Sequence, residues 1–131
     1  MKKLGILNSQ ISALISQLGH TDRIVICDAG LPIPDEVTRI DLAVVPGLPS
    51  FFEVVQAVLL EMQVEKAIFA AELMAAQPDV YSGLQATLPD VELDSVSHAE
   101  FKELTKAAKA IIRTGECTPY ANVILQAGVT F

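Results

Sequence analysis

His20 and Asp28 flank one short apolar segment of the sequence. One residue of such a pair can donate or accept a proton, and the other can orient the side chain that does so. That segment, residues 24–27 (Ile-Val-Ile-Cys), is typical of a strand buried on both faces. A carboxylate does not stay inside such a core, so Asp28 marks the point where the strand leaves it. In open α/β sheets, ligands bind beyond the carboxyl ends of the strands. The pair therefore predicts a site in which a histidine transfers a proton and a carboxylate orients the histidine.

Further along the chain, His98 stands where a predicted strand passes into a helix capped by Ser97. This is the same kind of position as that of Asp28, although His98 could also be only the first residue of a capped helix. Tyr120 and Asn122 bring a hydroxyl and an amide to a polar loop, which they could bind to a ligand or simply hold together.

Three other features have structural explanations. Arg113 and Glu116 could form a structural ion pair. The potential zinc ligands lack the close spacing of a metal site, so we expect no metal and no other cofactor. Two cysteines cannot build a disulfide framework, which fits a reducing cytoplasm. The four potential zinc ligands are His20, His98, Cys27 and Cys117.

Apolar periodicity and capping residues predict alternating helices and strands. Because strands alternate with helices along the whole chain, we expect one three-layer α/β/α domain over residues 1–131, with a central sheet that is mostly parallel or mixed. The predicted helices begin at Asn8 or Ser9, at the Ser50 capping box, at Pro78 and at the Ser97 capping box, and the predicted strands cover 24–27, 40–45, 66–71, 91–96, 110–113 and a last segment from Asn122.

Composition excludes several functional classes. A net charge of −7 without any basic run leaves no cationic surface for nucleic acid. The longest apolar runs fall well short of the ~18 residues that span a bilayer, so we expect no membrane insertion. The chain is 51% hydrophobic but only 5% aromatic, which is more aliphatic surface than one small core easily hides. We therefore expect subunit contacts and a homo-oligomer.

Three stretches carry a resemblance to a known family. They are residues 19–22 (Gly-His-Thr-Asp), 28–34 (Asp-Ala-Gly-Leu-Pro-Ile-Pro) and 112–122 (Ile-Arg-Thr-Gly-Glu-Cys-Thr-Pro-Tyr-Ala-Asn). The sequence resembles the family that contains ribose pyranase and fucose mutarotase. The resemblance extends from residue 7 to residue 131.

This resemblance implies an isomerase that interconverts the β-pyranose and β-furanose forms of D-ribose and supplies the furanose to ribokinase. It also implies a cytoplasmic, metal-independent enzyme that assembles as a decamer of two pentameric rings. By position in the motifs, His20 would be the catalytic acid, and the sugar would be bound by Asp28, His98, Tyr120, Ala121 and Asn122.

Two other classes of function are alternatives. In phosphatases of the haloacid dehalogenase type an aspartate after an apolar strand is the nucleophile, but a second aspartate is expected where this chain has Gly30. The other alternative is a non-catalytic sugar-binding accessory protein of a ribose transporter.

The sequence also suggests a pocket shared between subunits. The loop at 118–122 lies far along the chain from His20 and leads into an apolar terminal segment suited to an interface. In a ring, a head-to-tail contact repeats at every junction, so one chain could offer His20 and its neighbour Tyr120 and Asn122.

Overall fold

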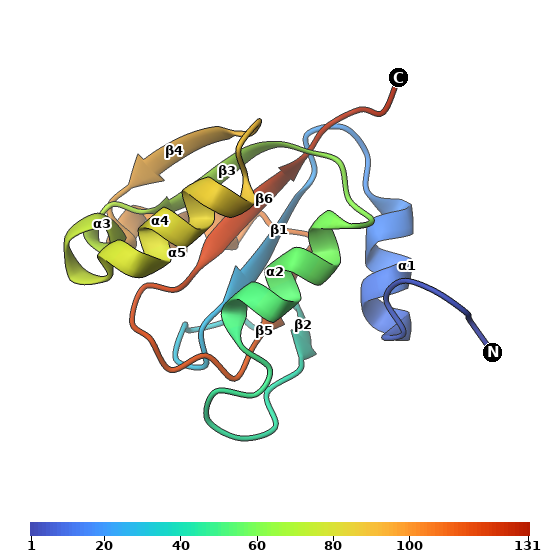
Figure 1. Cartoon of the computed structure of the whole chain (residues 1–131), viewed down its shortest axis with the longest axis horizontal. Coiled ribbons are helices and arrows are strands. Elements are labelled where there is room, and N and C mark those ends of the chain that lie inside the picture. Colours follow the sequence, from blue (N-terminus) through green and yellow to red (C-terminus); the bar gives the residue numbers. More distant parts are fainter.

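The computed structural model describes all 131 residues, as five helices and six strands (Figure 1). The helices and strands follow in the order α1 Ser9–Gln17, β1 Arg23–Cys27, β2 Thr38–Asp41, α2 Phe51–Leu59, β3 Val64–Ala70, α3 Glu72–Ala76, α4 Pro78–Thr87, β4 Glu92–Val96, α5 His98–Thr105, β5 Ala110–Arg113 and β6 Val123–Ala127. No helix is both long and apolar enough to cross a bilayer.

Side chains that the sequence marks as caps start three of the helices. The Asn8 side chain accepts a hydrogen bond from the third residue of α1, and Ser50 and Glu53 form a reciprocal capping box at α2. Ser97 caps α5 by accepting from the backbone N–H of Glu100. The caps satisfy backbone groups that a helix start leaves unpaired, so these helices begin where the sequence predicts.

All six strands form one sheet, in the order β2-β5-β1-β6-β3-β4. β6 runs antiparallel to both of its neighbours, β1 and β3, whereas every other pairing is parallel. The mixed sheet confirms the predicted α/β fold. The carboxyl ends of five strands consequently meet at one edge of the sheet, and the first residues of β6 join them there.

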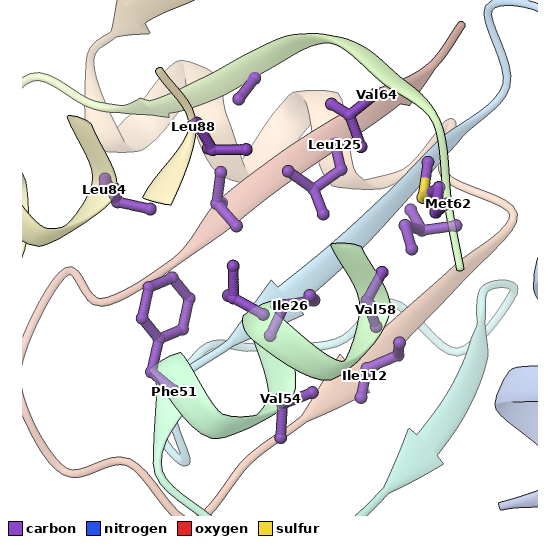
Figure 2. Close-up of a cluster of buried hydrophobic side chains, with 14 of the residues drawn as sticks. Ile26, Phe51, Val54, Val58, Met62, Val64, Leu84, Leu88, Ile112 and Leu125 are labelled. Atoms are coloured by element: carbon purple, nitrogen blue, oxygen red, sulfur yellow. The ribbon is translucent and has the colours of Figure 1, made fainter. Parts of the chain in front are cut away.

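Helices cover both faces of this sheet. On one face, α1, α2, α3 and α4 pack on strand residues such as Ile26 and Leu125. Figure 2 shows Val54 and Val58 of α2 beside Ile26 of β1. On the other face, Phe101 of α5 packs with Val25 and Ile111. Alternating residues of β1 thus enter two separate cores, as a strand buried on both faces requires.

Two predicted segments differ in the structure. The strand expected over 40–45 is Thr38–Asp41, and Val44 and Val45 beyond it are exposed, next to a turn closed by a single Val45–Leu48 bridge. The terminal apolar segment, expected at an interface, is the central strand β6 between β1 and β3. Its Val123 and Leu125 are fully buried in the core of their own chain, so their apolar character reflects that core.

Candidate functional site

A cavity of about 590 Å³ opens at the edge where the carboxyl ends of the strands meet. Loops after β1 and β5, the first turns of α5 and the approach to β6 form its walls. This is the position at which α/β sheets bind ligands. The cavity is lined by Asp28, Ala29, Gly30, Leu31, Pro32, His98, Lys102, Glu116, Cys117, Thr118, Pro119 and Tyr120.

Asp28 is held by the side chain of Asn122. The Asn122 carboxamide accepts from the backbone N–H of Asp28 at 2.8 Å and donates to its carboxylate Oδ2 at 2.9 Å. The other carboxylate oxygen accepts from the backbone N–H of Gly30 at 2.9 Å. Asn122 itself is fully buried, as is Ala121, and neither lines the cavity. In a single chain Asn122 therefore orients Asp28 from behind the cavity wall.

His98 faces the ring of Tyr120 across the cavity wall. The two rings meet edge to face with centroids 5.1 Å apart. The backbone N–H of His98 donates to both carboxylate oxygens of Glu72, at 2.9 and 3.1 Å, and this bond holds the pKa of Glu72 below its usual range. The imidazole Nδ1 is shielded from solvent and has no hydrogen-bond partner within the chain. Such an atom is a candidate to bind a ligand hydroxyl.

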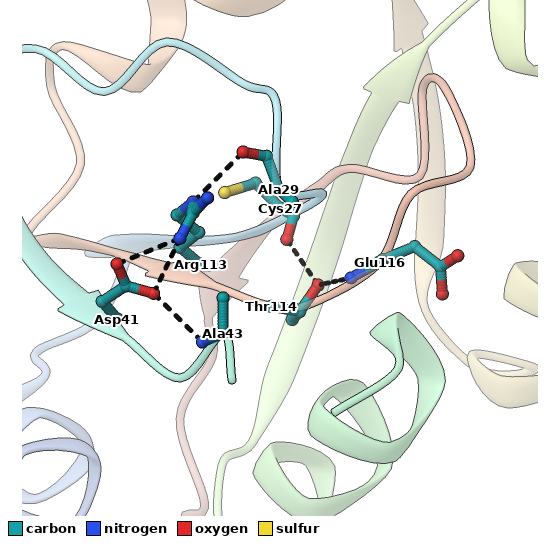
Figure 3. Close-up of polar contacts among 7 residues, drawn as sticks. All are labelled: Cys27, Ala29, Asp41, Ala43, Arg113, Thr114 and Glu116. Carbon is teal, nitrogen blue, oxygen red and sulfur yellow. Dashed lines mark hydrogen bonds and ion pairs between the residues drawn. The ribbon is translucent and has the colours of Figure 1, made fainter. Parts of the chain in front are cut away.

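The loop that carries Asp28 is fastened to the end of β5 (Figure 3). Arg113 donates from Nε to the carbonyl of Ala29 and pairs with the carboxylate of Asp41 at 3.1 Å. The Thr114 hydroxyl donates to the carbonyl of Cys27 at 2.8 Å. These bonds fix the direction in which the chain leaves β1.

The suggested ion pair between Arg113 and Glu116 is not formed. Arg113 pairs with Asp41 because β2 and β5 are neighbours in register, which places the two residues opposite each other. Glu116 instead accepts from Thr118 and from the backbone N–H of Phe51. Although burial alone would raise it, these bonds hold the pKa of Glu116 below its usual range.

Only two residues other than glycine have positive φ; one is next to His20 and the other is the candidate residue Tyr120 itself. They are Thr21, next to His20, with φ of 70°, and Tyr120, with φ of 67°. A bulky side chain rarely adopts this conformation, and such strain concentrates at functional sites. At Tyr120 the backbone turns sharply, with the N–H of Asn122 donating to the Tyr120 carbonyl at 2.7 Å. Nothing in the residue types predicted this conformation.

His20 lies just before β1 begins, whereas this cavity lies where β1 ends, so the two are at opposite ends of the strands. Since five-residue β1 separates them at about 3.3 Å per residue, His20 and Asp28 are roughly 16 Å or more apart. The prediction that Asp28 orients His20 is therefore wrong for a single chain. The two residues flank one strand in sequence, and for that reason they stand at its opposite ends.

The side chain that contacts His20 is Glu65 of β3, whose Oε2 lies 2.9 Å from the imidazole Nε2. His20 borders a second hollow of about 380 Å³, which also includes Leu18, Met62 and Phe131. Glu65 and the cavity residue Lys102 were missed by sequence reasoning. Glu65 lies on β3, 45 residues from His20, so no local pattern links the two.

The remaining reactive groups are not gathered into a metal site. No three His, Cys, Asp or Glu side chains come together as ligands. Cys27 is buried in the sheet, and burial raises the pKa of its thiol to about 12. Cys117 is exposed at the cavity, and neither cysteine forms a disulfide.

Comparison with known proteins places this geometry in context. A sequence model of the RbsD / FucU transport protein family matches residues 1–130. D-ribose pyranase of Geobacillus thermodenitrificans (strain NG80-2) is 56% identical over 131 residues, covering 100% of this chain and 99% of that protein. D-ribose pyranase of Vibrio vulnificus (strain YJ016) is 55% identical over 139 residues, covering 100% of both chains.

Solved structures agree with the sequence comparison. The structure of Bacillus subtilis RbsD complexed with D-ribose superposes with a TM-score of 0.97 at 55% identity, covering 100% of both chains. FucU from Bifidobacterium longum superposes with a TM-score of 0.80 at 26% identity, covering 95% of this chain and 97% of the other.

Proposed function

Because this chain belongs to the RbsD / FucU transport protein family, we propose that it is an isomerase interconverting the β-pyranose and β-furanose forms of D-ribose. The observation that carries the proposal is its 55–56% identity, over the full chain, to proteins named D-ribose pyranase. The polar cavity around Asp28 supports it, since its carboxylate, imidazole and ammonium groups can all bind sugar hydroxyls.

The reaction requires only proton transfers. Removing the proton of the anomeric hydroxyl while protonating the ring oxygen breaks the ring C–O bond and gives the open-chain aldehyde. Attack of a different hydroxyl on that aldehyde, with both transfers reversed, closes the other ring. Atoms and charge balance without a nucleophile from the protein and without a redox partner. A histidine can both accept and donate a proton, which suits both directions.

We assign the roles in this reaction as follows. His20 is the group that transfers the proton. Asp28, His98 and Tyr120 bind the sugar directly from the cavity wall. Ala121 and Asn122 complete the binding site from behind it, Asn122 by orienting the Asp28 carboxylate.

We further propose that neighbouring subunits share each pocket. The support is the distance between His20 and the cavity, which lie at opposite edges of one sheet. Tyr120, Asp28 and His98 stand together in one chain, so a second chain has to bring its His20 edge to that cavity. A head-to-tail ring repeats this junction at every subunit.

The family's description as transport proteins favours one second candidate function. The chain would then be a non-catalytic sugar-binding accessory of a ribose transporter. Both functions need the same cavity, so binding of ribose does not distinguish them, whereas acceleration of ring interconversion does.

We expect the protein to accelerate exchange between the ring forms of D-ribose, measured by NMR exchange spectroscopy with and without protein. General acid/base catalysis predicts an acceleration of about 10²–10⁴-fold at the site. It should persist after exhaustive chelation, because proton transfer by His20 needs no metal. Binding of ribose without faster exchange would favour the accessory function, and recovery only on added zinc or magnesium would contradict a metal-independent reaction.

We expect a large closed oligomer, a decamer of two pentameric rings, when size exclusion is coupled to light scattering. The support is apolar surface that one chain leaves open: Leu4, Leu7 and Val44 are 82%, 76% and 72% exposed. Contact with another subunit would bury these side chains. A monodisperse monomer at micromolar concentration would contradict both the decamer and the shared pocket.

The cellular setting is part of the same proposal. We place the protein in the cytoplasm as a single domain spanning residues 1–131, where its furanose product would feed ribokinase. The two free thiols are compatible with a reducing compartment.

A further inference from the structure

The backbone of β3 is irregular where it carries Glu65. In the pairing of β3 with β6, Val64 is opposite Ala127 and Lys66 is opposite Gln126, so Glu65 is an extra residue without a partner. The side chains of Val64 and Ala67 consequently enter the same core. In a regular strand, side chains three positions apart would point to opposite faces of the sheet. A bulge of this kind turns one side chain out of the regular alternation. Here that side chain is the carboxylate that contacts His20.

Hydrogen bonds across three neighbouring strands fix the direction of this carboxylate. Arg23 of β1 donates from Nε to Gln126 Oε1 at 2.9 Å. Because an arginine can only donate, this bond settles the orientation of the Gln126 amide and leaves its NH₂ group facing β3. That NH₂ donates to Glu65 Oε1 at 2.7 Å, and the other oxygen, Oε2, lies 2.9 Å from His20 Nε2.

The charge state of Glu65 decides which imidazole nitrogen carries a proton. Hydrogen bonds from Gln126 and then from His20 hold the pKa of Glu65 below its usual range, so the carboxylate is ionised at neutral pH. An ionised carboxylate only accepts, so His20 Nε2 is the donor. In the neutral imidazole the other nitrogen, Nδ1, then carries the lone pair.

The turn that carries His20 is itself fixed. Thr21, with its positive φ, donates from its backbone N–H to the Ala127 carbonyl at 2.9 Å, and the N–H of Ala127 donates back to Asp22. Asp22 also accepts from the N–H of Gly19 at 2.9 Å. Backbone hydrogen bonds to Ala127 of β6 and the Asp22 side chain therefore fix the turn, while Glu65 contacts the His20 ring.

We propose that Glu65, oriented by Gln126 and Arg23, holds His20 as its Nε2–H tautomer, so that the proton exchanged with the sugar passes through Nδ1. This rests on the proposed function, in which His20 transfers that proton. Neutral Nδ1 accepts the proton of the anomeric hydroxyl, and protonated Nδ1 returns a proton to a ring oxygen. Nε2 keeps its hydrogen throughout, so Glu65 is a positioning residue that never contacts the sugar.

The test is Glu65→Gln, which keeps the shape of the side chain and removes its charge. A glutamine amide can donate to Nε2, which would favour the other tautomer. We expect kcat for ring exchange to fall by most of the acid/base contribution of about 10²–10⁴-fold, with KM for ribose unchanged, because neutralising the acceptor behind a catalytic histidine favours the wrong tautomer. The matched control is Glu61→Gln, because Glu61 borders the same hollow but pairs with Lys2 and not with His20. It should leave kcat unchanged.

The tautomer is read directly by solid-state ¹⁵N NMR of histidine-labelled, sedimented protein at a pH where the imidazole is neutral. The chain has only two histidines, so His20→Ala assigns both sets of signals. We expect His20 to show protonated Nε2 and unprotonated Nδ1, and Glu65→Gln to shift it toward protonated Nδ1, with His98 unchanged. Wild-type His20 protonated at Nδ1 would overturn the proposal without any variant.

The outcomes separate this inference from the proposed function. If His20→Ala abolishes exchange but Glu65→Gln keeps wild-type kcat, the positioning role is overturned and the proposed function stands. If Glu65→Gln loses kcat with an unchanged tautomer, Glu65 does not act by holding the tautomer of His20, and the proposed positioning role is overturned. If His20→Ala retains exchange, the proposed role of His20 fails, and transfer through Nδ1 fails with it.

Discussion

Replacing His20 with alanine should reduce ribose ring exchange to near the uncatalysed rate while ribose still binds. The expected loss is the whole acid/base contribution, about 10²–10⁴-fold. Binding should survive because the cavity that contains Asp28 and His98 is built at the other edge of the sheet and loses no contact within its own chain. NMR exchange measures the rate, and calorimetry with ribose measures binding.

A matched control for this experiment is Lys106→Ala, which removes an exposed side chain of the same chain. Lys106 pairs only with Glu103 on the surface, so its replacement should change neither exchange nor binding. Light scattering should show the wild-type particle size for both variants. A His20→Ala protein that keeps most of the acceleration would eliminate His20 as the proton-transfer group.

Two inactive variants should restore activity when they are unfolded together and reassembled as mixed rings. One chain carries His20→Ala and the other Asp28→Ala, so each homomeric ring lacks one part of every site. With a shared pocket, a junction is intact when the His20→Ala chain supplies the cavity with Asp28 and the neighbouring Asp28→Ala chain supplies His20. Random mixing at equal amounts produces this arrangement at about one quarter of the junctions, so about a quarter of wild-type exchange should return.

Asp28 is the better partner variant because Asn122 is fully buried and orients Asp28 from behind the cavity. Replacing Asn122 would combine a loss of binding with a disturbed core. Each variant refolded alone, and the two mixed without unfolding, serve as controls and should stay inactive. If the co-refolded mixture also stays at the level of its parts, both groups come from one chain and the shared pocket is refuted.

The amino-acid sequence by itself determined most of the framework. The apolar run at 24–27 predicted a strand buried on both faces, and caps such as Ser50 placed helix starts correctly. These features are local, because a buried strand and a helix cap each depend on a few neighbouring residues. The long motifs around Asp28 and Asn122 also sufficed to indicate the family that the full-length match establishes.

Tertiary structure alone decided which of the candidate residues meet. Asp28 and Asn122 are 94 residues apart and bond directly, because β6 runs antiparallel beside β1 and starts where β1 ends. His20 is eight positions from Asp28 and lies at the far edge, because the strand between them is extended. Sequence separation measures distance along the chain, whereas the order and direction of strands set distance in space.

The partner of His20 belongs to the same category. Glu65 faces His20 only because β3 takes an extra residue against β6 and Gln126 receives its orientation from Arg23 on the next strand. No spacing in the sequence records a bulge or the strand that lies across from it. The sequence therefore determined which chemical groups this protein has and which elements carry them, and the pairing of strands decided which groups can act together.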